Sequence, residues 1–512
     1  MTPDPERLQI DAGPKASTGI AGLDDILDGG LPRNHLYLIE GDPGTGKTTI
    51  ALQFLLEGLA HGEKGLYVTL SESKRELLGV AQSHGWNLEN LTIFEMTPLE
   101  EELSAEAQYT IFHPSEVELA DTTSSVLKQV DMLQPSRVVI DSLSELRMLA
   151  RDPLRYRRQI LAMKTYFAGR NCTVLLLDDR TAEGNDLQLQ SIAHGVILMQ
   201  SLEREFGNKR RRIEIRKMRG MRFREGFHDY GIETGGVVVH PRLVASEHRQ
   251  HSTREPLLSG ISELDDLFGG GIDRGTSTLM IGPAGSGKST IAVRYAATAA
   301  ERGELAVIFT FDETIATLLH RAAGLGIPLK AHIDSGKIVV RQIDPAELSP
   351  GEFISQVCRF VGDHQARVVV IDSLNGFLNA MPGESFLAVQ MHELLAYLNQ
   401  KGVASIMTLA QHGFVGTNMA TPVDVSYLAD SVLFFRFFEA NGAVKQAISV
   451  LKKRSGGHER SIRELIFANG HIRVGASLAD FRGVLTGVPT YVGGGEHLGG
   501  NAHGKLTRSD SE

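Results

Sequence analysis

Short apolar runs alternate with longer amphipathic stretches along most of the chain. In the first half, the runs of strand length span residues 35–41, 65–70, 136–141, 172–179 and 195–200. Apolar strands that alternate with helices are typical of a mostly parallel sheet sandwiched by helices. The pattern therefore predicts an α/β fold. Residues 211–218 and 236–241 form shorter alternating segments, which favour antiparallel strands at the end of this half.

The chain contains two copies of one unit. Four landmarks recur in the same order, at residues 17–33 and 258–274, 41–49 and 282–290, 137–146 and 367–377, and 214–220 and 449–455. The unit takes up nearly half of the 512 residues, which is domain-sized and too long for a solenoid repeat. We predict a first domain over residues 1–247 and a second over 248–491. The glycine-rich residues 492–512 have little apolar content, so we expect a disordered tail.

Composition and charge narrow the class of protein. The net charge of −10 argues against a protein that mainly coats nucleic acid. Cys172 and Cys358, the two cysteines, cannot form a disulfide framework or a cysteine-based zinc site. The polar N-terminus has no apolar signal core, and no apolar run is long enough to span a membrane. We therefore expect a cytoplasmic protein that does not contact membranes.

Each copy carries a glycine-rich phosphate loop. Gly41–Thr48 and Gly282–Ser289 both match G-x-x-x-x-G-K-[ST] between an apolar strand and an amphipathic helix. Glycines allow backbone N–H groups to turn towards phosphates, the lysine neutralises phosphate charge, and the final hydroxyl, of Thr48 or Ser289, is the expected Mg²⁺ ligand. The candidate nucleotide-binding residues are Gly41, Gly44, Thr45, Gly46, Lys47, Thr48 and Thr49 in the first loop and Gly282, Gly285, Ser286, Gly287, Lys288, Ser289 and Thr290 in the second.

Carboxylates follow two further apolar runs in each copy. Asp141 and Asp372 each end such a run, where a buried strand delivers a carboxylate that supports Mg²⁺. The pairs Ser71-Glu72 and Asp312-Glu313 follow another strand at equivalent places after the two loop lysines. Hydrolysis or phosphoryl transfer needs an acid that orients or deprotonates the attacking oxygen. We therefore expect the acids of these pairs to be catalytic, with Asp312 as a further candidate metal ligand.

These features resemble the KaiC family of circadian-clock ATPases and kinases. The resemblance covers residues 15–490 and rests on two phosphate-loop domains, each opening with G-I-x-x-L-D-D and carrying an acid pair after a strand. It implies tandem RecA-like P-loop domains in a homo-hexameric double ring, with Mg²⁺-ATP between neighbouring subunits. It also implies ATPase activity in the first domain, autokinase and autophosphatase activity in the second, and signalling or clock-type regulation with a KaiB-like or other signalling partner.

The resemblance assigns nucleotide contacts outside the phosphate loops as well. A family loop that reaches the ATP of the adjacent subunit is matched by Lys217, Met218 and Arg219 and, in the second copy, by Lys452 and Arg454. Ser83 and Asp229 fall where family members contact the nucleotide. Positive charges from a neighbour would stabilise charge on the transferring phosphoryl group, as arginine fingers do.

Two of the departures from the family bear directly on its chemistry. Its phosphorylated Ser-Thr pair is replaced here by Ser426-Tyr427. Ser426 fits as phosphoacceptor, whereas the hydroxyl of Tyr427 lies farther from the backbone than that of a threonine, so we expect one-site phosphorylation. Ser71 replaces a glutamate of the first acid pair, which leaves hydrolysis in the first domain to Glu72.

Two other functions remain open from the sequence. Residues 209–224 contain nine basic side chains and one acid, a stripe that fits a RecA- or helicase-like DNA motor. Sparse aromatic residues and the acidic net charge argue against that function, and nucleic acid is not an expected partner. An ATP-assembled signalling scaffold with little kinase activity is the other alternative, which basal ATP turnover distinguishes from a kinase.

Overall fold

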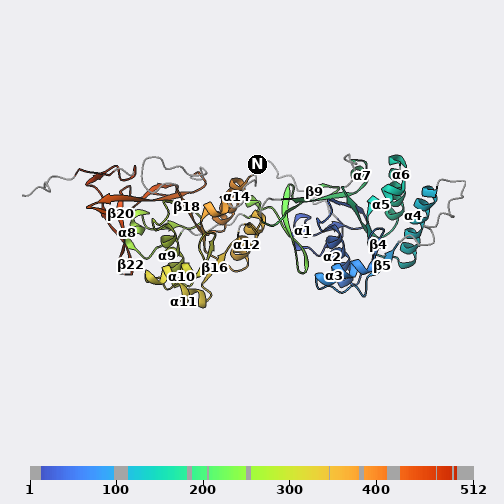
Figure 1. Cartoon of the computed structure of the whole chain (residues 1–512), viewed down its shortest axis with the longest axis horizontal. Coiled ribbons are helices and arrows are strands. Elements are labelled where there is room, and N and C mark those ends of the chain that lie inside the picture. Colours follow the sequence, from blue (N-terminus) through green and yellow to red (C-terminus); the bar gives the residue numbers. More distant parts are fainter. Residues whose placement is uncertain are drawn as a thin grey trace, which may run out of the picture. The chain divides into compact units, whose positions relative to one another are not determined.

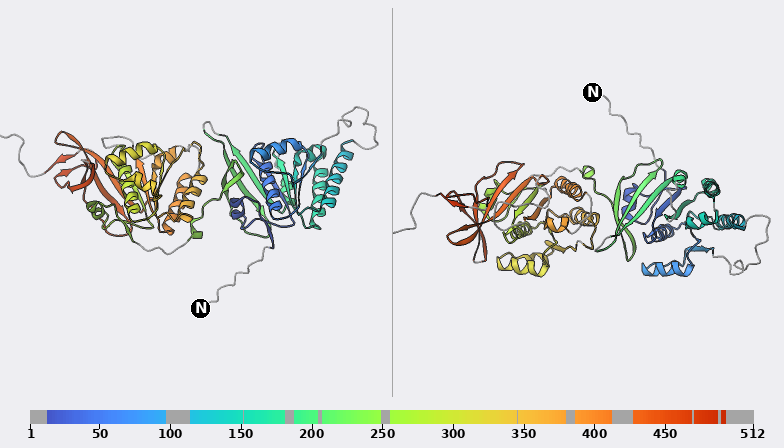
Figure 2. Two further views of the ribbon diagram at one scale, coloured as in Figure 1. Left: turned by 90° about the horizontal axis from the view of Figure 1, so that it is seen from below. Right: turned by 45° about the horizontal axis from the view of Figure 1, so that its top comes forward.

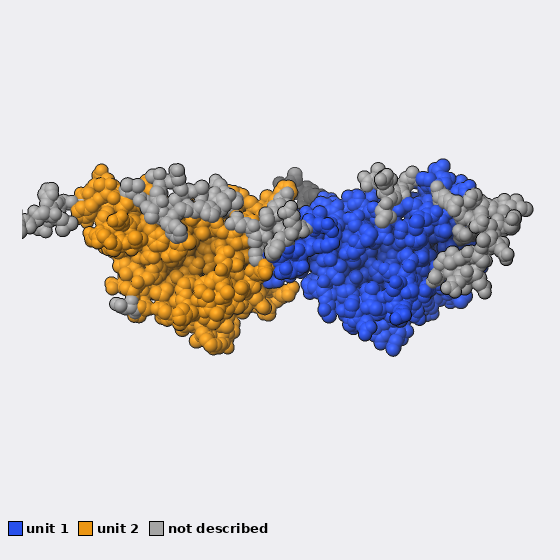
Figure 3. Space-filling model, in the orientation of Figure 1, with its two compact units in different colours: residues 1–243, 346–356 blue, residues 244–345, 357–512 orange. Residues whose placement is uncertain are grey.

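The chain forms two compact units (Figure 3). Unit 1 comprises residues 1–243 and 346–356, and unit 2 comprises residues 244–345 and 357–512. The computed structural model describes residues 13–96, 114–150, 152–180, 187–203, 207–248, 255–344, 346–379, 386–411, 427–468, 470–486 and 489–492. Most of the expected joint near residues 248–256 and of the expected tail therefore lies outside the described residues.

Unit 1 contains a nine-stranded sheet in the order β11-β10-β9-β8-β3-β7-β6-β4-β5. Figure 1 labels three of its strands, β9, β4 and β5. The six strands from β8 to β5 are parallel, and β9, β10 and β11 extend the sheet antiparallel. The strands are β3 (Leu36–Gly41), β4 (Gly65–Thr69), β5 (Thr92–Glu95), β6 (Arg137–Asp141), β7 (Thr173–Asp179), β8 (Gly195–Leu202), β9 (Arg210–Met218), β10 (Phe227–Glu233) and β11 (Gly236–His240). The predicted mostly parallel sheet and its antiparallel end are confirmed.

Unit 2 repeats this sheet, in the order β16-β15-β17-β18-β14-β19-β20-β21-β22. The strands from β16 to β19 are parallel, and β20, β21 and β22 form the antiparallel extension. The strands are β14 (Ser277–Gly282), β15 (Ala306–Thr310), β16 (Ile338–Gln342), β17 (Val368–Asp372), β18 (Ala404–Ala410), β19 (Ser431–Ala440), β20 (Ala443–Lys453), β21 (Arg463–Ala468) and β22 (His471–Ser477). The second sheet has the strand order of the first, as expected for a duplicated domain.

Helices lie on both faces of each sheet (Figure 2). In the first repeat they are α1 (Ala21–Ile26), α2 (Lys47–Ala60), α3 (Lys74–Ser83), α4 (Pro114–Leu133), α5 (Leu143–Ala150), α6 (Pro153–Ala168) and α7 (Leu187–Ile192). In the second they are α8 (Ser262–Leu267), α9 (Lys288–Glu301), α10 (Ile315–Gly324), α11 (Leu329–Asp334), α12 (Pro350–Gly362), α13 (Leu374–Asn379) and α14 (Leu387–Gln400). The predicted sandwich of helices around a sheet is confirmed.

Neighbouring residues of each central strand pack into opposite cores. In β3, Tyr37 and Ile39 belong to the core that includes α2, whereas Leu36 and Leu38 belong to the core that includes α5 and α6. A parallel sheet covered on both faces is apolar at nearly every strand position for this reason. The continuous apolar runs of the sequence are therefore strands buried on both sides.

Short elements complete the described fold. They are the 3₁₀ helix Ala245–His248 and three antiparallel strand pairs, β1 (Lys15–Ala16) with β2 (Leu31–Pro32), β12 (Pro256–Leu257) with β13 (Ile272–Asp273), and β23 (Phe481–Arg482) with β24 (Thr490–Tyr491). Over the ranges that the structure describes, none of the helices has the length and apolar character needed to cross a membrane.

Candidate functional site

Each phosphate loop joins a buried strand to the start of a helix. In unit 1, β3 leads into the loop and α2 begins at Lys47; in unit 2, β14 leads into the loop and α9 begins at Lys288. The preceding residues, Gly46 and Gly287, have φ angles of 92° and 100°, which L side chains rarely adopt. Neither glycine offers a capping side chain, so the first N–H groups of each helix stay uncapped and can bind an anion.

The antiparallel extension fills the space behind each loop. A Cβ atom at Gly46 would lie 2.8 Å from Ile232 of β10, and one at Gly287 would lie 2.5 Å from Phe467 of β21. In unit 1 the hydroxyl of Tyr230 also donates a hydrogen bond to the carbonyl oxygen of Thr45 (2.7 Å). The loop glycines are therefore required by packing as well as by backbone conformation.

The loop lysines are buried and donate to carbonyl oxygens of their own loops. Lys47 Nζ bonds Gly41 O at 2.7 Å, and Lys288 Nζ bonds Gly282 O at 2.9 Å. Lys47 also forms an ion pair with Asp179 Oδ1 (2.7 Å) at the end of β7. Ala410 ends the equivalent strand β18 in unit 2. Burial lowers the pKa of Lys288 to about 8, against a smaller opposing effect of Asp372.

The hydroxyl that ends each loop motif contacts the predicted aspartate. Thr48 Oγ1 donates to Asp141 Oδ2 (3.2 Å), and Ser289 Oγ donates to Asp372 Oδ1 (3.0 Å). Burial raises the pKa of both carboxyls, and hydrogen bonds from neighbouring side chains oppose that effect. Hydroxyl and carboxylate oxygens are ligands that Mg²⁺ prefers, so both pairs fit a bound Mg²⁺ ion.

A different side chain anchors each of these aspartates. The hydroxyl of Tyr67, on β4, donates to Asp141 Oδ2 in unit 1. The hydroxyl of Thr408, on β18, donates to Asp372 Oδ1 in unit 2. The same carboxylate is therefore held from opposite neighbouring strands in the two repeats, since β4 and β7 flank β6 whereas β15 and β18 flank β17.

The acid of the first site is half-buried and only partly hydrogen-bonded. Glu72 lies in a turn after β4, where Thr69 Oγ1 accepts from its N–H (3.0 Å) and donates to its carbonyl oxygen (2.6 Å). Its Oε2 atom is buried and has no hydrogen-bond partner among the described residues. Burial, followed by the negative charge of Asp141, raises the pKa of the Glu72 carboxyl, and Lys47 opposes this rise. This oxygen is an acceptor that no described group occupies.

The acid pair of the second site is engaged by neighbouring side chains. Glu313 lies in the same turn as Glu72, on the hydroxyl of Thr310. Arg321 donates to both of its carboxylate oxygens, at 3.1 and 2.6 Å. Asp312 accepts a hydrogen bond from the hydroxyl of Ser373. A cavity of about 520 Å³ is lined by Lys288, Ser289, Asp312, Glu313, Arg321 and Asp372, among others.

Sequence reasoning missed Asp179 and Arg321. The run 172–179 ends in two aspartates, which is a signal that a strand delivers carboxylates to the loop edge. Arg321 gave no comparable signal, because its contact with Glu313 depends on how helix α10 packs back on the strand-end turn. Both residues contact a group that the motifs had already identified.

The residues expected to reach a neighbouring subunit lie far from the phosphate loop of their own unit. Lys217 pairs in register near the beginning of β8, at the amino ends of the parallel strands, whereas the loop follows their carboxyl ends. Its ammonium group donates to the carbonyl oxygens of Gln190 (2.6 Å) and Ala193 (2.8 Å), and Arg219 donates to that of Ser191 (2.9 Å). Met218 is buried beside them.

The equivalent residues of unit 2 have a similar position. Lys452 lies opposite Val432 near the beginning of β19 and donates to the carbonyl oxygen of Ala429 (2.7 Å). Arg454 is half-exposed, 3.5 Å from Asp430. In neither unit does the structure bring these cations to the phosphate loop of the same unit.

The remaining predicted residues are Ser83, Asp229 and Ser426. Ser83 is exposed at the end of α3 and donates to the carbonyl oxygen of Val80 (2.7 Å). Asp229 accepts a hydrogen bond from the N–H of Gly351 (2.8 Å) within unit 1. Ser426 lies outside the described residues, and its neighbour Tyr427 is exposed.

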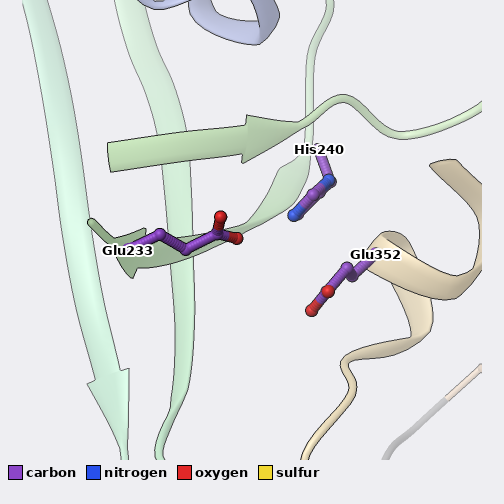
Figure 4. Close-up of side chains that lie close together, drawn as sticks. All are labelled: Glu233, His240 and Glu352. Carbon is purple, nitrogen blue, oxygen red and sulfur yellow. The ribbon is translucent and has the colours of Figure 1, made fainter. Parts of the chain in front are cut away.

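A separate cluster of ionisable side chains lies in unit 1. Glu233, His240 and Glu352 point towards one another, with their nearest ligand atoms within 4.8 Å (Figure 4). Burial and the charge of Glu233 raise the pKa of the Glu352 carboxyl, and the nearby Arg210 opposes this rise. Since an arginine of the protein already balances part of this negative charge, we assign no metal to the cluster.

Comparison with known proteins places both repeats in one family. Residues 16–244 and 257–479 match the family model described as KaiC ATPase. The circadian clock oscillator protein KaiC of Parasynechococcus marenigrum is 26% identical over 487 residues, which cover 93% of each chain. The KaiC proteins of Thermostichus vulcanus and Prochlorococcus marinus are also 26% identical, over 93% and 95% of this chain and 92% and 97% of theirs. The chain, with its two RecA-like phosphate-loop domains, therefore belongs to the KaiC ATPase family.

Proposed function

We propose that each phosphate loop binds Mg²⁺-ATP and that the chain hydrolyses it. The observation that carries this proposal is the common cavity of unit 2, where the loop lysine, the metal-binding hydroxyl, Asp372 and the acid pair face one space. Its volume of about 520 Å³ is in the range of ligand pockets. The equivalent contacts between Thr48 and Asp141 support the same function in unit 1.

The mechanism follows from the residues around each loop. Lys47 and Lys288 bind phosphate oxygens, and the pairs Thr48–Asp141 and Ser289–Asp372 would hold Mg²⁺. Bound Mg²⁺ neutralises charge on the phosphate oxygens. Glu72 orients a water molecule, whose oxygen forms a bond to the γ-phosphorus while the bond from phosphorus to the bridging oxygen of ADP breaks. The proton of the water passes to the carboxylate, and ADP and phosphate leave.

We propose two further properties from the family resemblance. The chain assembles as a homo-hexamer in which the loops of Lys217 and Arg219 and of Lys452 and Arg454 complete the nucleotide sites of neighbouring subunits. In the second domain, Asp312 or Glu313 takes the proton of the Ser426 hydroxyl, whose oxygen then accepts the γ-phosphoryl group as ADP leaves. The position of these cations, away from the loops of their own units, supports contacts with another subunit.

ATP hydrolysis by the purified chain tests the first proposal. Lys47→Ala and Lys288→Ala should each remove one of two bound nucleotides and the turnover of that site, and the double variant should bind none. Lys330→Ala, on exposed helix α11, serves as the matched control. A double variant that still hydrolyses ATP at the original rate would contradict the assignment.

Phosphopeptide mapping after incubation with Mg²⁺-ATP tests the autokinase. We expect one phosphate on Ser426 that is lost in Ser426→Ala and in the double variant Asp312→Asn, Glu313→Gln. If the chain hydrolyses ATP but gains no phosphate, it is an ATPase without autokinase activity.

A further inference from the structure

Arg321 connects the acid of the second site to the phosphate-binding helix. Its Nε and Nη2 atoms donate to the two carboxylate oxygens of Glu313, and its Nη1 atom donates to Thr290 Oγ1 (2.8 Å). Thr290 follows the loop residue Ser289 in the first turn of α9. The Arg321 and Glu313 side chains are 27% and 20% exposed, so water screens this pair less than a surface pair. A bidentate contact of this kind fixes both the position and the direction of the carboxylate.

The first repeat has no arginine at this place. Val80 stands eight positions after Glu72, as Arg321 stands eight positions after Glu313, and it packs against the hydrophobic core of unit 1. Both glutamates occupy the same turn on a threonine hydroxyl, so their different surroundings do not arise from the backbone. One carboxylate oxygen of Glu72 therefore has no hydrogen-bond partner in the part of the chain that the structure describes, whereas Arg321 donates to both oxygens of Glu313.

This difference bears directly on water activation. An acid that orients water must accept a hydrogen bond from the water and then its proton. A carboxylate that already accepts two charge-assisted hydrogen bonds is a weaker acceptor, because the nearby cation stabilises its charged form. Asp312, the other acid of the pair, contacts Ser373 and not Arg321. The second site thus has its water-orienting acid restrained and a separate acid beside it.

We propose that Arg321 slows ATP hydrolysis at the second site by holding Glu313 in an ion pair, so that bound ATP lasts longer there than at the first site. This inference rests on the proposed role of Glu72 and Glu313 as acids that orient the attacking water. A longer-lived nucleotide favours transfer to a protein hydroxyl over loss to water. Arg321 is in this sense a positioning residue that determines the fate of the phosphoryl group.

The experiment uses the full chain with Lys47→Ala, so that ATP turnover reports the second site. In this background, Arg321→Val introduces the residue of the first repeat, and we expect ADP production to rise about 10-fold or more. Arg321→Lys, which keeps the charge but loses the bidentate contact, should lie between the two. Adding Glu313→Gln should abolish the gain, because the arginine acts through that carboxylate. Damage to the fold would lower the rate of ADP production, so an increase in that rate cannot come from misfolding.

The controls separate this inference from the proposed function. His320→Val, at the exposed neighbouring position of α10, should leave turnover unchanged. If the Lys288→Ala chain hydrolyses ATP at its first site but Arg321→Val brings no increase at the second, the role of Arg321 is wrong. If Arg321→Val weakens ATP binding, Arg321→Gln is measured in its place, and turnover that still does not rise also overturns the inference. If neither site hydrolyses ATP in any variant, the proposed ATPase fails as well.

Discussion

The two phosphate-loop sites share a backbone but differ in the partners of their charged groups. In the first, Lys47 is paired with Asp179, and one carboxylate oxygen of Glu72 has no hydrogen-bond partner among the described residues. In the second, the loop lysine has no such aspartate at the end of the neighbouring strand, and the acid Glu313 is paired with Arg321. In the first site an aspartate thus partly neutralises the positive charge of the loop lysine. In the second site an arginine neutralises the negative charge of the acid.

This comparison shows where duplicated domains diverge. Every residue of the loop motif and its aspartate has a counterpart in both repeats, and their contacts agree closely. Differences lie in the groups around them, among them Asp179 against Ala410 and Val80 against Arg321. We therefore expect the two sites to bind the same nucleotide and to differ in affinity and turnover.

The largest expected effect is an unequal loss from removing each acid. Glu72→Gln should lower first-site hydrolysis by roughly 100-fold or more, since it removes the acceptor that orients water. Glu313→Gln should change second-site hydrolysis by less than about threefold, since that carboxylate is already occupied. Turnover in the Lys288→Ala and Lys47→Ala backgrounds measures the two sites separately. Equal losses would remove the distinction between the acids.

Replacing Asp179 by alanine should make the first site resemble the second in affinity. Lys47 then has no ion pair to exchange for a phosphate, and a negative charge near the phosphates is removed, so ATP should bind about 10-fold more tightly, which corresponds to about 1.4 kcal/mol. Ala410→Asp should weaken the second site in the opposite direction. Titration with a fluorescent ATP analogue measures both. An affinity that falls in Asp179→Ala would show that this aspartate supports the nucleotide instead.

ATP binding at the second site should weaken severalfold as the pH rises. The pKa of Lys288 is about 8 in the free site, so raising the pH from 7 to 9 removes its charge and should weaken ATP binding, with proton uptake on binding near pH 8. This folded-state pKa lies below the usual 10.5. Between about pH 8 and 10.5 the unfolded chain therefore binds more protons than the folded chain, so the contribution of Lys288 to the free energy of unfolding rises with pH in this range. Calorimetry of the Lys47→Ala chain in buffers of different ionisation enthalpy detects the proton; binding without uptake at pH 8 contradicts the prediction.

The last expected effect is on folding stability and concerns the hydrogen bonds that hold Asp141 and Asp372. Tyr67→Phe removes the hydrogen bond to Asp141 and should lower the free energy of unfolding of the first unit by about 1–3 kcal/mol. Thr408→Val should have a similar effect in the second unit through Asp372. Denaturant unfolding followed by probes in each unit checks whether each loss stays within its own unit.

The sequence was sufficient for the fold, and the structure brings the predicted loop lysines, hydroxyls and aspartates close together. Continuous apolar runs and a repeated loop motif identify strands buried on both faces and two phosphate loops, because burial and loop geometry restrict residue types locally. The partners of Glu72 and Glu313 could not be predicted, because Val80 and Arg321 both suit an amphipathic helix. Only the packing of that helix against the strand-end turn shows that Arg321 contacts the acid of its repeat, whereas Val80 packs into the core.

The support behind each loop glycine has a consequence for synthesis of the chain. Ile232 and Phe467, which fill the space behind Gly46 and Gly287, belong to strands that come near the end of each repeat. A ribosome makes the chain from its N-terminus, so each loop emerges well over a hundred residues before its supporting strand. Each repeat must therefore be almost fully translated before its loop is braced, and a nascent chain that stops short of the antiparallel strands carries the complete motif without its finished site.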